Sequence, residues 1–210
     1  MNSVITIGRE FGSGGREIGR LLAEKFGVPF YDKKLLEESS KNSGICEDLF
    51  VRHDESVSNS FLFSLVMGTY PVSPDGRMNP EMPLNHRIFL AQFDTIKKLG
   101  QTPCVIVGRC ADFVLEDRHN IVTAFVTGNM YEKKRRIAER YDIEKDKLDD
   151  FIKKTDKRRA NYYEYYTDRK WGMAGNYNIC VNSSLVGIDG AVKLIADYVL
   201  MKEEYCKASL

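Results

Sequence analysis

The sequence predicts an α/β protein whose core is a parallel sheet of five strands covered by helices. Five short apolar runs, rich in β-branched residues, recur along the chain at positions 4–7, 29–32, 103–107, 121–127 and 177–181. Segments with apolar residues at helical spacing separate these runs, and this alternation is typical of βαβ units. With 210 residues, of which 43% are hydrophobic, the chain is long enough for one domain with a substantial core.

The periodicity divides this single domain, residues 1–210, into a core and two elaborations. The core covers about 1–44, 84–143 and 172–210. Between them, about 45–83 loses its period and carries four prolines, so we expect a helical insertion with a long loop. We expect that loop either to act as a flap or to be disordered around residues 73–81. The stretch of about 144–171 alternates charged and aromatic residues and predicts a helical lid.

Composition excludes several classes of protein. The chain has 31 basic and 30 acidic residues, a net charge of +1, which argues against a broad nucleic-acid surface. Five cysteines without a C-x-x-C pair and three scattered histidines predict no metal ligands and reduced thiols. The longest uncharged apolar stretch, residues 61–70, is about half a bilayer span. We expect a cytoplasmic protein with a small-molecule partner and no nucleic-acid or membrane partner; the oligomeric state is left open.

A glycine-rich loop joins the first predicted strand to the first helix. Glycines let backbone N–H groups turn toward a ligand, and a helix N-terminus adds about half a positive charge. We therefore expect a phosphate to bind the loop and the start of the helix, which comprise Gly12, Ser13, Gly14, Gly15, Arg16 and Glu17. The alternative is a glycine-rich turn that only joins a strand to a helix.

This loop departs from two known phosphate-binding patterns. When the P-loop pattern G-x-x-x-x-G-K-[ST] is aligned on Gly14, its first glycine falls on Arg9 and its lysine on Gly15. The Ser/Thr falls on Arg16, which is the nearest cation and is expected to contact phosphate with help from other arginines. The dinucleotide pattern G-x-G-x-x-G fails at Glu17.

The second strand, Pro29 to Tyr31, ends in Asp32. Ligands of open α/β sheets bind at the carboxyl ends of the strands, so Asp32 is a candidate to contact a substrate hydroxyl or base. Aspartate is also favoured at helix N-caps, and Asp32 precedes a predicted helix over residues 33–41. Both interpretations remain open. After the insertion, a further helix is predicted from Leu84 to Leu99.

The apolar strand of residues 103–107 leads directly into Gly108 and Arg109. An always-charged planar guanidinium at the carboxyl end of a buried strand is well placed to grip a phosphate. We therefore expect Arg109 to be a catalytic and substrate-binding residue. The alternative is a surface arginine paired with Asp112 or Asp117.

Two basic segments follow. In the helix YEKKRRIAERY, Lys133 and Lys134 are expected to face solvent, whereas Arg135, Arg136 and Arg140 could point toward the nucleotide. In the lid, we expect Lys157, Arg158 and Arg159 to reach a transferring phosphoryl group, with both arginines catalytic. The lid also contains four tyrosines that favour packing over base stacking, namely Tyr162, Tyr163, Tyr165 and Tyr166.

The closing strand of residues 177–181 precedes a helix over residues 188–205. Helical spacing assigns five of its residues to the inward face, namely Ala191, Leu194, Ile195, Tyr198 and Val199.

Taken together, these motifs resemble the cytidylate kinase-like family, relatives of bacterial cytidylate kinase among the P-loop nucleoside monophosphate kinases. The similar segments are ITIGREFGSGGREIGRLLAEKFG, PFYDKKLL, VIVGRCADFVL and YNICVNSSLVGIDGAV. The resemblance implies that Arg109 holds a monophosphate. The family's next aspartate falls on Cys110, so Asp112 is expected as its substitute in substrate binding. Arg135 and Arg136 match paired arginines that bind the cofactor.

The resemblance extends to the lid, where the family's aspartate matches Asp156 and its later arginine position falls on Tyr162. It implies a three-layer P-loop fold, ATP with Mg²⁺, and transfer of the γ-phosphoryl group to CMP or another small phosphate acceptor. Two other functions remain open. The missing lysine favours a catalytically silent nucleotide-binding module, and Asp32, about 20 residues after the glycines, is where a dinucleotide-dependent oxidoreductase has its ribose-binding acid.

Overall fold

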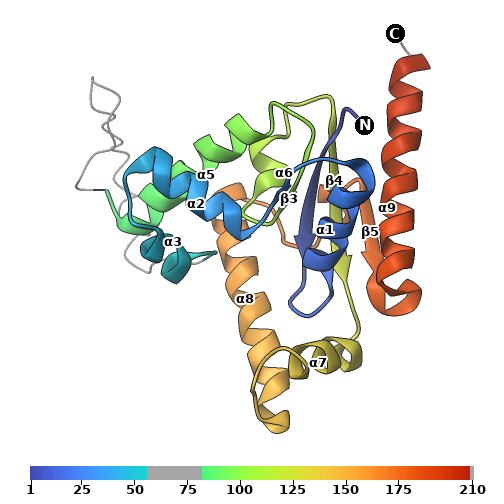
Figure 1. Ribbon diagram of the computed structural model, residues 1–210. Coiled ribbons are helices and arrows are strands. Elements are labelled where there is room, and N and C mark those ends of the chain that lie inside the picture. Colours follow the sequence, from blue (N-terminus) through green and yellow to red (C-terminus); the bar gives the residue numbers. More distant parts are fainter. Residues whose placement is uncertain (56–81, 209–210) are drawn as a thin grey trace.

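The computed structural model describes residues 1–55 and 82–208 (Figure 1). Its helices and strands, in chain order, are β1 (Val4–Arg9), α1 (Gly15–Phe26), β2 (Phe30–Tyr31), α2 (Lys33–Ser43), α3 (Glu47–His53), α5 (Leu84–Leu99), β3 (Cys104–Val107), α6 (Ala111–Val114), β4 (Ile121–Thr127), α7 (Met130–Ala138), α8 (Leu148–Thr167), β5 (Ile179–Asn182) and α9 (Ser183–Ala208). Short 3₁₀ turns lie at Lys145–Lys147 and Ala174–Asn176.

The five strands form one sheet in the order β2-β3-β1-β4-β5, and every neighbouring pair is parallel. The predicted fold class and all five strands are thus confirmed. Because β1 lies between β3 and β4, the carboxyl ends of these strands meet at one edge of the sheet. The glycine loop after β1 and the Gly108 turn after β3 therefore lie side by side.

The strand order also decides against the dinucleotide interpretation. In a dinucleotide-binding sheet the second strand lies directly beside the first, which brings its terminal acid to the ribose. Here β3 separates β2 from β1. Asp32, at the end of β2, is therefore not placed as a ribose-binding acid would be.

The side chains of each strand point alternately to the two faces of the sheet, and helices cover the apolar side chains on both faces. Ile5 and Ile7 of β1 point to the face covered by α1 and α9. Val4 of β1 and Ile106 of β3 point to the opposite face, which is covered by α2, α3, α5 and α6. The result is a three-layer arrangement with a separate apolar core on each side.

Helix α9 corrects one part of the sequence prediction. Ala191, Ile195 and Val199 recur every four residues and are fully buried, as predicted. Leu194 lies about 100° around the helix from Ile195 and is 45% exposed. Gly187, with a φ of 72°, interrupts the helix near its start.

The structure describes the whole of the predicted lid but only part of the insertion. Helix α3 forms inside the segment for which a long loop was expected, and the expected flap and the apolar stretch 61–70 lie outside the described residues. The lid segment contains the 20-residue helix α8. Its tyrosines pack as predicted: Tyr162 and Tyr163 are buried, and the Tyr166 ring stacks on Phe89 with 3.7 Å between centroids.

Helix α8 contacts other helices at both of its ends. Near its start, Leu148 and Ile152 pack with Ile137 of α7, and near its end the tyrosines pack on α5. Figure 1 shows α8 running from α7 toward α5 along the edge where β1 and β3 end. Among the described helices, none combines the length and apolar character needed to cross a bilayer.

Candidate active site

The glycine loop has the backbone shape of an anion-binding turn. Gly12 and Gly14 have φ values of 80° and 82°, a region that side-chain-bearing residues avoid, and α1 begins at the next residue, Gly15. The Ser13 hydroxyl donates to the Glu10 carbonyl at 2.8 Å, which closes the turn. The first N–H groups of a helix have no intrahelical acceptor. The start of α1 therefore offers its amides and its positive dipole end to an anion such as a phosphate.

The paired arginines of α7 have different surroundings. Arg136 is buried, and its Nη1 donates to the Gly12 carbonyl and to the Ser183 hydroxyl, each at 3.3 Å. Arg135 instead pairs with Glu132 at 2.8 Å and Glu139 at 2.9 Å on the exposed side of the helix. Arg136 therefore supports the loop from behind, and the expectation that Arg135 points toward the nucleotide is wrong in this arrangement.

Lys133 corrects a second expectation for α7. It was assigned to a solvated face, but its side chain is only 6% exposed and its Nζ lies 3.2 Å from Glu10 and 2.8 Å from Asp156. Asp156 of α8 also accepts from the Phe11 amide at 2.6 Å. Lys133 thus links the glycine loop to α8. Lys134, paired with Asp149 and partly exposed, matches the expectation.

Arg16 and Glu17, at the start of α1, are both paired with side chains outside the glycine loop. The Arg16 Nε donates to Asp32 at 2.6 Å, and its side chain is 64% exposed. Glu17 accepts from Arg140 at 2.9 Å, so Arg140 does not approach the loop as a free cation. The predicted replacement of the P-loop lysine by Arg16 is therefore not supported by its position.

Asp32 is neither a helix cap nor free for a ligand. Its side chain makes no capping hydrogen bond to α2, which contradicts the N-cap interpretation, and instead accepts from Arg16 and, at 3.4 Å, from Arg109. Burial alone would raise the pKa of Asp32, but Arg109 and Arg16 outweigh it and lower the pKa. Asp32 is therefore a charged link between β2, α1 and the turn after β3.

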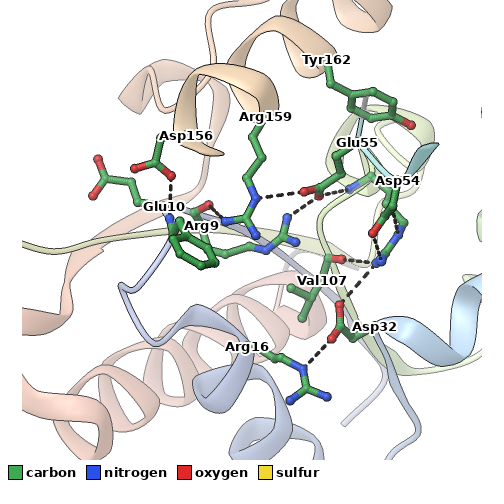
Figure 2. A network of polar contacts seen from close by, with 12 residues as sticks. Arg9, Glu10, Arg16, Asp32, Asp54, Glu55, Val107, Asp156, Arg159 and Tyr162 are labelled. Carbon is green, nitrogen blue, oxygen red and sulfur yellow. Dashed lines mark hydrogen bonds and ion pairs between the residues drawn. The ribbon is translucent and has the colours of Figure 1, made fainter. Parts of the chain in front are cut away.

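Arg109 lies at the predicted edge of the sheet but is fully engaged. Its Nε and Nη2 donate to the two oxygens of Asp54 at 2.9 and 2.8 Å, and its Nη1 donates to the Val107 carbonyl at 3.1 Å (Figure 2). The side chain is 1% exposed. The alternative of a surface pair with Asp112 or Asp117 is therefore wrong. An acceptor phosphate could reach this guanidinium only by displacing Asp54.

A second buried ion cluster lies beside Arg109. Glu55 accepts from the Arg9 Nη1 at 2.6 Å and, through its other oxygen, from the Arg159 Nε at 2.9 Å (Figure 2). Burial alone would raise the pKa of Glu55, but Arg9, Arg159 and Arg109 hold it well below its ordinary value. Arg159, predicted as a catalytic lid residue, therefore points inward from α8. Arg158, predicted with it, is exposed on the helix surface.

A cavity of about 20 Å³ lies among these groups, roughly the room for one water molecule. It brings together Arg9, Glu55, Arg109 and Arg159, and it is also lined by Asp112. The Asp112 carboxylate accepts from the Tyr163 hydroxyl at 2.7 Å, and burial raises its pKa. Arg109 and Asp112, which follow β3, and Arg159 of the lid segment thus meet at one site.

The sequence profile described as the cytidylate kinase-like family matches residues 4–185. The chain belongs to this family. No curated protein matches the sequence.

Two solved structures are similar to this chain over nearly its whole length. A crystal structure of an uncharacterized protein from Eubacterium ventriosum ATCC 27560 is 30% identical with a TM-score of 0.70, and the match covers 94% of this chain and 98% of that one. Shikimate kinase from Bacteroides thetaiotaomicron is 15% identical with a TM-score of 0.55, over 95% and 99% of the two chains. This second likeness shows that the fold is that of the P-loop kinases.

The cytidylate kinase-like family implies ATP and Mg²⁺, and the residues of this chain fit the two differently. The loop amides and the start of α1 fit the phosphates of a nucleotide. A P-loop usually adds a Ser/Thr hydroxyl for Mg²⁺, but that position is Arg16 here. Nor do the described residues contain a group of three or more His, Cys, Asp or Glu side chains suited to a metal ion. The described side chains therefore form no all-protein cage for the magnesium ion, which in nucleotide sites is held largely by phosphates and water.

Three residues of this site were not predicted from the sequence, namely Arg9, Asp54 and Glu55. Asp54 and Glu55 follow α3, in a segment without periodicity, so nothing in the sequence indicated that they turn inward. Arg9 could have been found, because it occupies the first glycine position of the P-loop pattern.

Proposed function

We propose that this protein is an ATP-dependent phosphotransferase that transfers the γ-phosphoryl group to CMP or another small phosphate acceptor. The observation that carries the proposal is the glycine loop between β1 and α1, whose Gly12 carbonyl accepts from the buried Arg136, in a chain of the cytidylate kinase-like family. Bound ATP supplies the transferable phosphoryl group. Positioning and electrostatic stabilisation make up most of phosphoryl-transfer catalysis, and this site offers both.

Each part of the chain has a defined role in this proposal. The amides of Gly12 to Arg16 hold the donor's β-phosphate, and Arg136 fixes the loop through the Gly12 carbonyl. Arg159 supplies positive charge from α8. Arg109 keeps its place on the acceptor side, where Asp54 occupies its guanidinium until an acceptor phosphate displaces it.

A catalytically silent nucleotide-binding module is the second candidate. The paired state of Arg109 favours it, because a buried guanidinium held bidentately by a carboxylate is costly to free. Both candidates require a nucleotide at the glycine loop. They differ only in whether an acceptor is phosphorylated.

The experiment measures binding and turnover separately. ATP with Mg²⁺ is titrated into the purified protein by calorimetry, and ADP release is followed with CMP, dCMP, UMP, AMP or shikimate as acceptor. Turnover of any acceptor above the acceptor-free rate supports the phosphotransferase. Binding of ATP without turnover of any acceptor favours the silent module, and the absence of ATP binding contradicts both.

A matched pair of glycine variants tests whether the loop is the binding site. In Gly12→Ala, the added Cβ would lie 3.0 Å from the Lys133 carbonyl, so the loop must shift. Gly27→Ala, at the other end of α1, has a φ of 64° but open space around the Cβ. Both variants incur a left-handed backbone cost of about 1–2 kcal/mol. We expect only Gly12→Ala to weaken ATP binding, and equal affinities of the two variants would contradict this placement.

A further inference from the structure

Two positions of the glycine loop have exchanged their usual side chains. In the P-loop pattern aligned on Gly14, the first glycine position holds Arg9 and the lysine position holds Gly15. A Cβ added to Gly15 would lie 2.5 Å from the Arg9 Cβ and 3.1 Å from its Cγ, distances that real side chains do not tolerate. With this backbone, a long side chain can therefore start from position 9 or from position 15, but not from both.

The Arg9 side chain runs from the glycine loop toward the turn after β3. A Cβ on Gly108 would overlap the Arg9 Nη1, so the guanidinium passes over Gly108 itself. Gly108 has a φ of 77°, and the absence of its side chain leaves this path open. The Arg9 guanidinium is thus buried between the loop and the acceptor side of the site (Figure 2). A cation that contacts both the donor and the acceptor phosphates must lie at this position.

The partner of Arg9 is an anion from the chain itself. The Glu55 carboxylate receives one guanidinium on each oxygen, from Arg9 at 2.6 Å and from Arg159 at 2.9 Å. Charge-assisted pairs of this kind bind carboxylates and phosphates alike. Glu55 also has a φ of 50°, which is uncommon for a residue other than glycine and costs on the order of 1–3 kcal/mol. A strained internal carboxylate therefore occupies a site built for an anion.

We propose that Arg9 replaces the P-loop lysine by contacting the donor's terminal phosphates together with Arg159, and that Glu55 holds both guanidinium groups until the nucleotide displaces it. This inference rests on the proposed function. During transfer, an acceptor oxygen forms a bond to the γ-phosphorus while the bond to the bridging oxygen breaks, and the electron pair leaves with ADP. Arg9 stabilises the charge that develops on that oxygen. It keeps its own proton, because a guanidinium stays protonated in proteins.

The experiment compares ATP and AMP affinities by calorimetry in the wild-type protein and in variants of positions 9 and 15. Arg9→Gln removes the charge. The double variant Arg9→Gly with Gly15→Lys restores the strict pattern, with the lysine at its usual position. Arg9→Gly alone is its reference, and Arg20→Gln is the matched control, since Arg20 lies exposed on α1 and pairs only with Glu24 among the described residues.

We expect Arg9→Gln to weaken ATP binding by about tenfold to a hundredfold, the usual effect of a lost charge-assisted hydrogen bond, and to leave AMP binding unchanged. The double variant should recover the preference for ATP over AMP that Arg9→Gly loses. A folded Arg9→Gln with wild-type affinity for ATP would overturn the proposal. If Arg9→Gln does not fold, the double variant decides, since its failure to prefer ATP when folded overturns the proposal as well.

The measurements separate this inference from the proposed function. A wild-type protein that prefers ATP through Arg9 but phosphorylates no acceptor retains the Arg9 contact and loses the phosphotransferase. Turnover that Arg9→Gln leaves intact retains the phosphotransferase and overturns the Arg9 contact. A wild-type protein that binds ATP no better than AMP overturns the Arg9 contact directly.

Discussion

The end of β1 and the turn after β3 are neighbours at one edge of the sheet, and each carries an arginine. Arg109, after β3, donates to two oxygens of Asp54, to Asp32 and to a backbone carbonyl. Arg9, the last residue of β1, shares the single carboxylate of Glu55 with Arg159. The two arginines thus have equal charge and similar burial, but the guanidinium of Arg109 is hydrogen-bonded far more completely than that of Arg9.

This difference shows that the charge and location of an arginine do not define a ligand-binding role. A guanidinium whose planar fork is already matched by a carboxylate mainly holds the structure together, because freeing it leaves two buried charges unpaired. Arg109 connects α3 to the ends of β2 and β3, whereas Arg9 is held by one residue that a ligand can replace. We therefore expect Arg109 to matter most for stability and Arg9 for nucleotide affinity.

Substitution of Arg109 should have the largest effect on stability. Arg109→Met leaves the buried Asp32 and the partly exposed Asp54 without this guanidinium, and loss of one partner of a buried pair costs about 3–5 kcal/mol. Urea denaturation measures this loss. Arg135→Met removes an arginine that is paired only at the surface and should leave stability unchanged. If Arg109→Met is as stable as wild type and only the acceptor KM rises, the comparison fails and Arg109 is an acceptor clamp.

Substitution of Glu55 should lower stability and increase the response to anions. Glu55→Gln leaves Arg9 and Arg159 without their carboxylate, which should cost about 1–3 kcal/mol at neutral pH. ATP or pyrophosphate should then raise the melting temperature more than in wild type, because no internal anion competes. Glu24→Gln, in the exposed pair with Arg20, is the control. A smaller anion response than wild type would mean that Glu55 helps to bind the ligand.

The difference in stability between wild type and Glu55→Gln should also depend on pH. The folded protein lowers the pKa of Glu55 below its ordinary value of 4.5, so its stabilising effect is fully present above pH 4.5. It is lost as the pH falls below that value toward the folded-state pKa. The stability difference between wild type and Glu55→Gln should therefore shrink below pH 4.5 in denaturation curves. A difference that stays constant down to pH 3 would contradict an ionic role.

The arginines of α7 should give the smallest effects. Arg136→Gln removes two long hydrogen bonds behind the glycine loop, which should weaken ATP binding by a few-fold, for a loss of about 1 kcal/mol. Arg135→Gln should leave ATP affinity unchanged, because its partners are on its own helix. Calorimetric titration compares the two. Equal losses would show that the helix as a whole, rather than Arg136, positions the loop.

Most of the fold could be predicted from the sequence, because the elements have local signals. The strands β1 and β4 are continuous apolar runs, and α1 ends at Gly27, whose φ of 64° suits a helix C-terminus. The insertion was expected to be helical, but the bounds of α3 were not predicted, because this helix is only 7 residues long and lies in a segment rich in polar residues. Short helices of this kind depend on tertiary packing, here of Phe50 into the core.

The site was predicted only in part, because ion pairing depends on contacts between distant segments. Arg109, Arg159 and the glycine loop were found from their positions next to strands or in a basic helix. Their partners lie far away in sequence, as with Glu55, which is 104 residues from Arg159. The sequence motif also led to the same predicted role for Arg135 and Arg136, although successive helical residues point about 100° apart. Only the packed structure separates the buried arginine from the exposed one.

Helix α8 is anchored at both ends, which limits how the predicted lid can move. Its 20 residues span about 30 Å between the contact with α7 and the contact with α5. A flap that swings about one end would have to break one of these packed clusters, whereas a small rotation of the helix about its own axis leaves both ends in place. Asp156 and Arg159, three residues apart, lie on one side of the helix and would turn together. The contact of Asp156 with the Phe11 amide and that of Arg159 with Glu55 would therefore tighten or loosen as one movement.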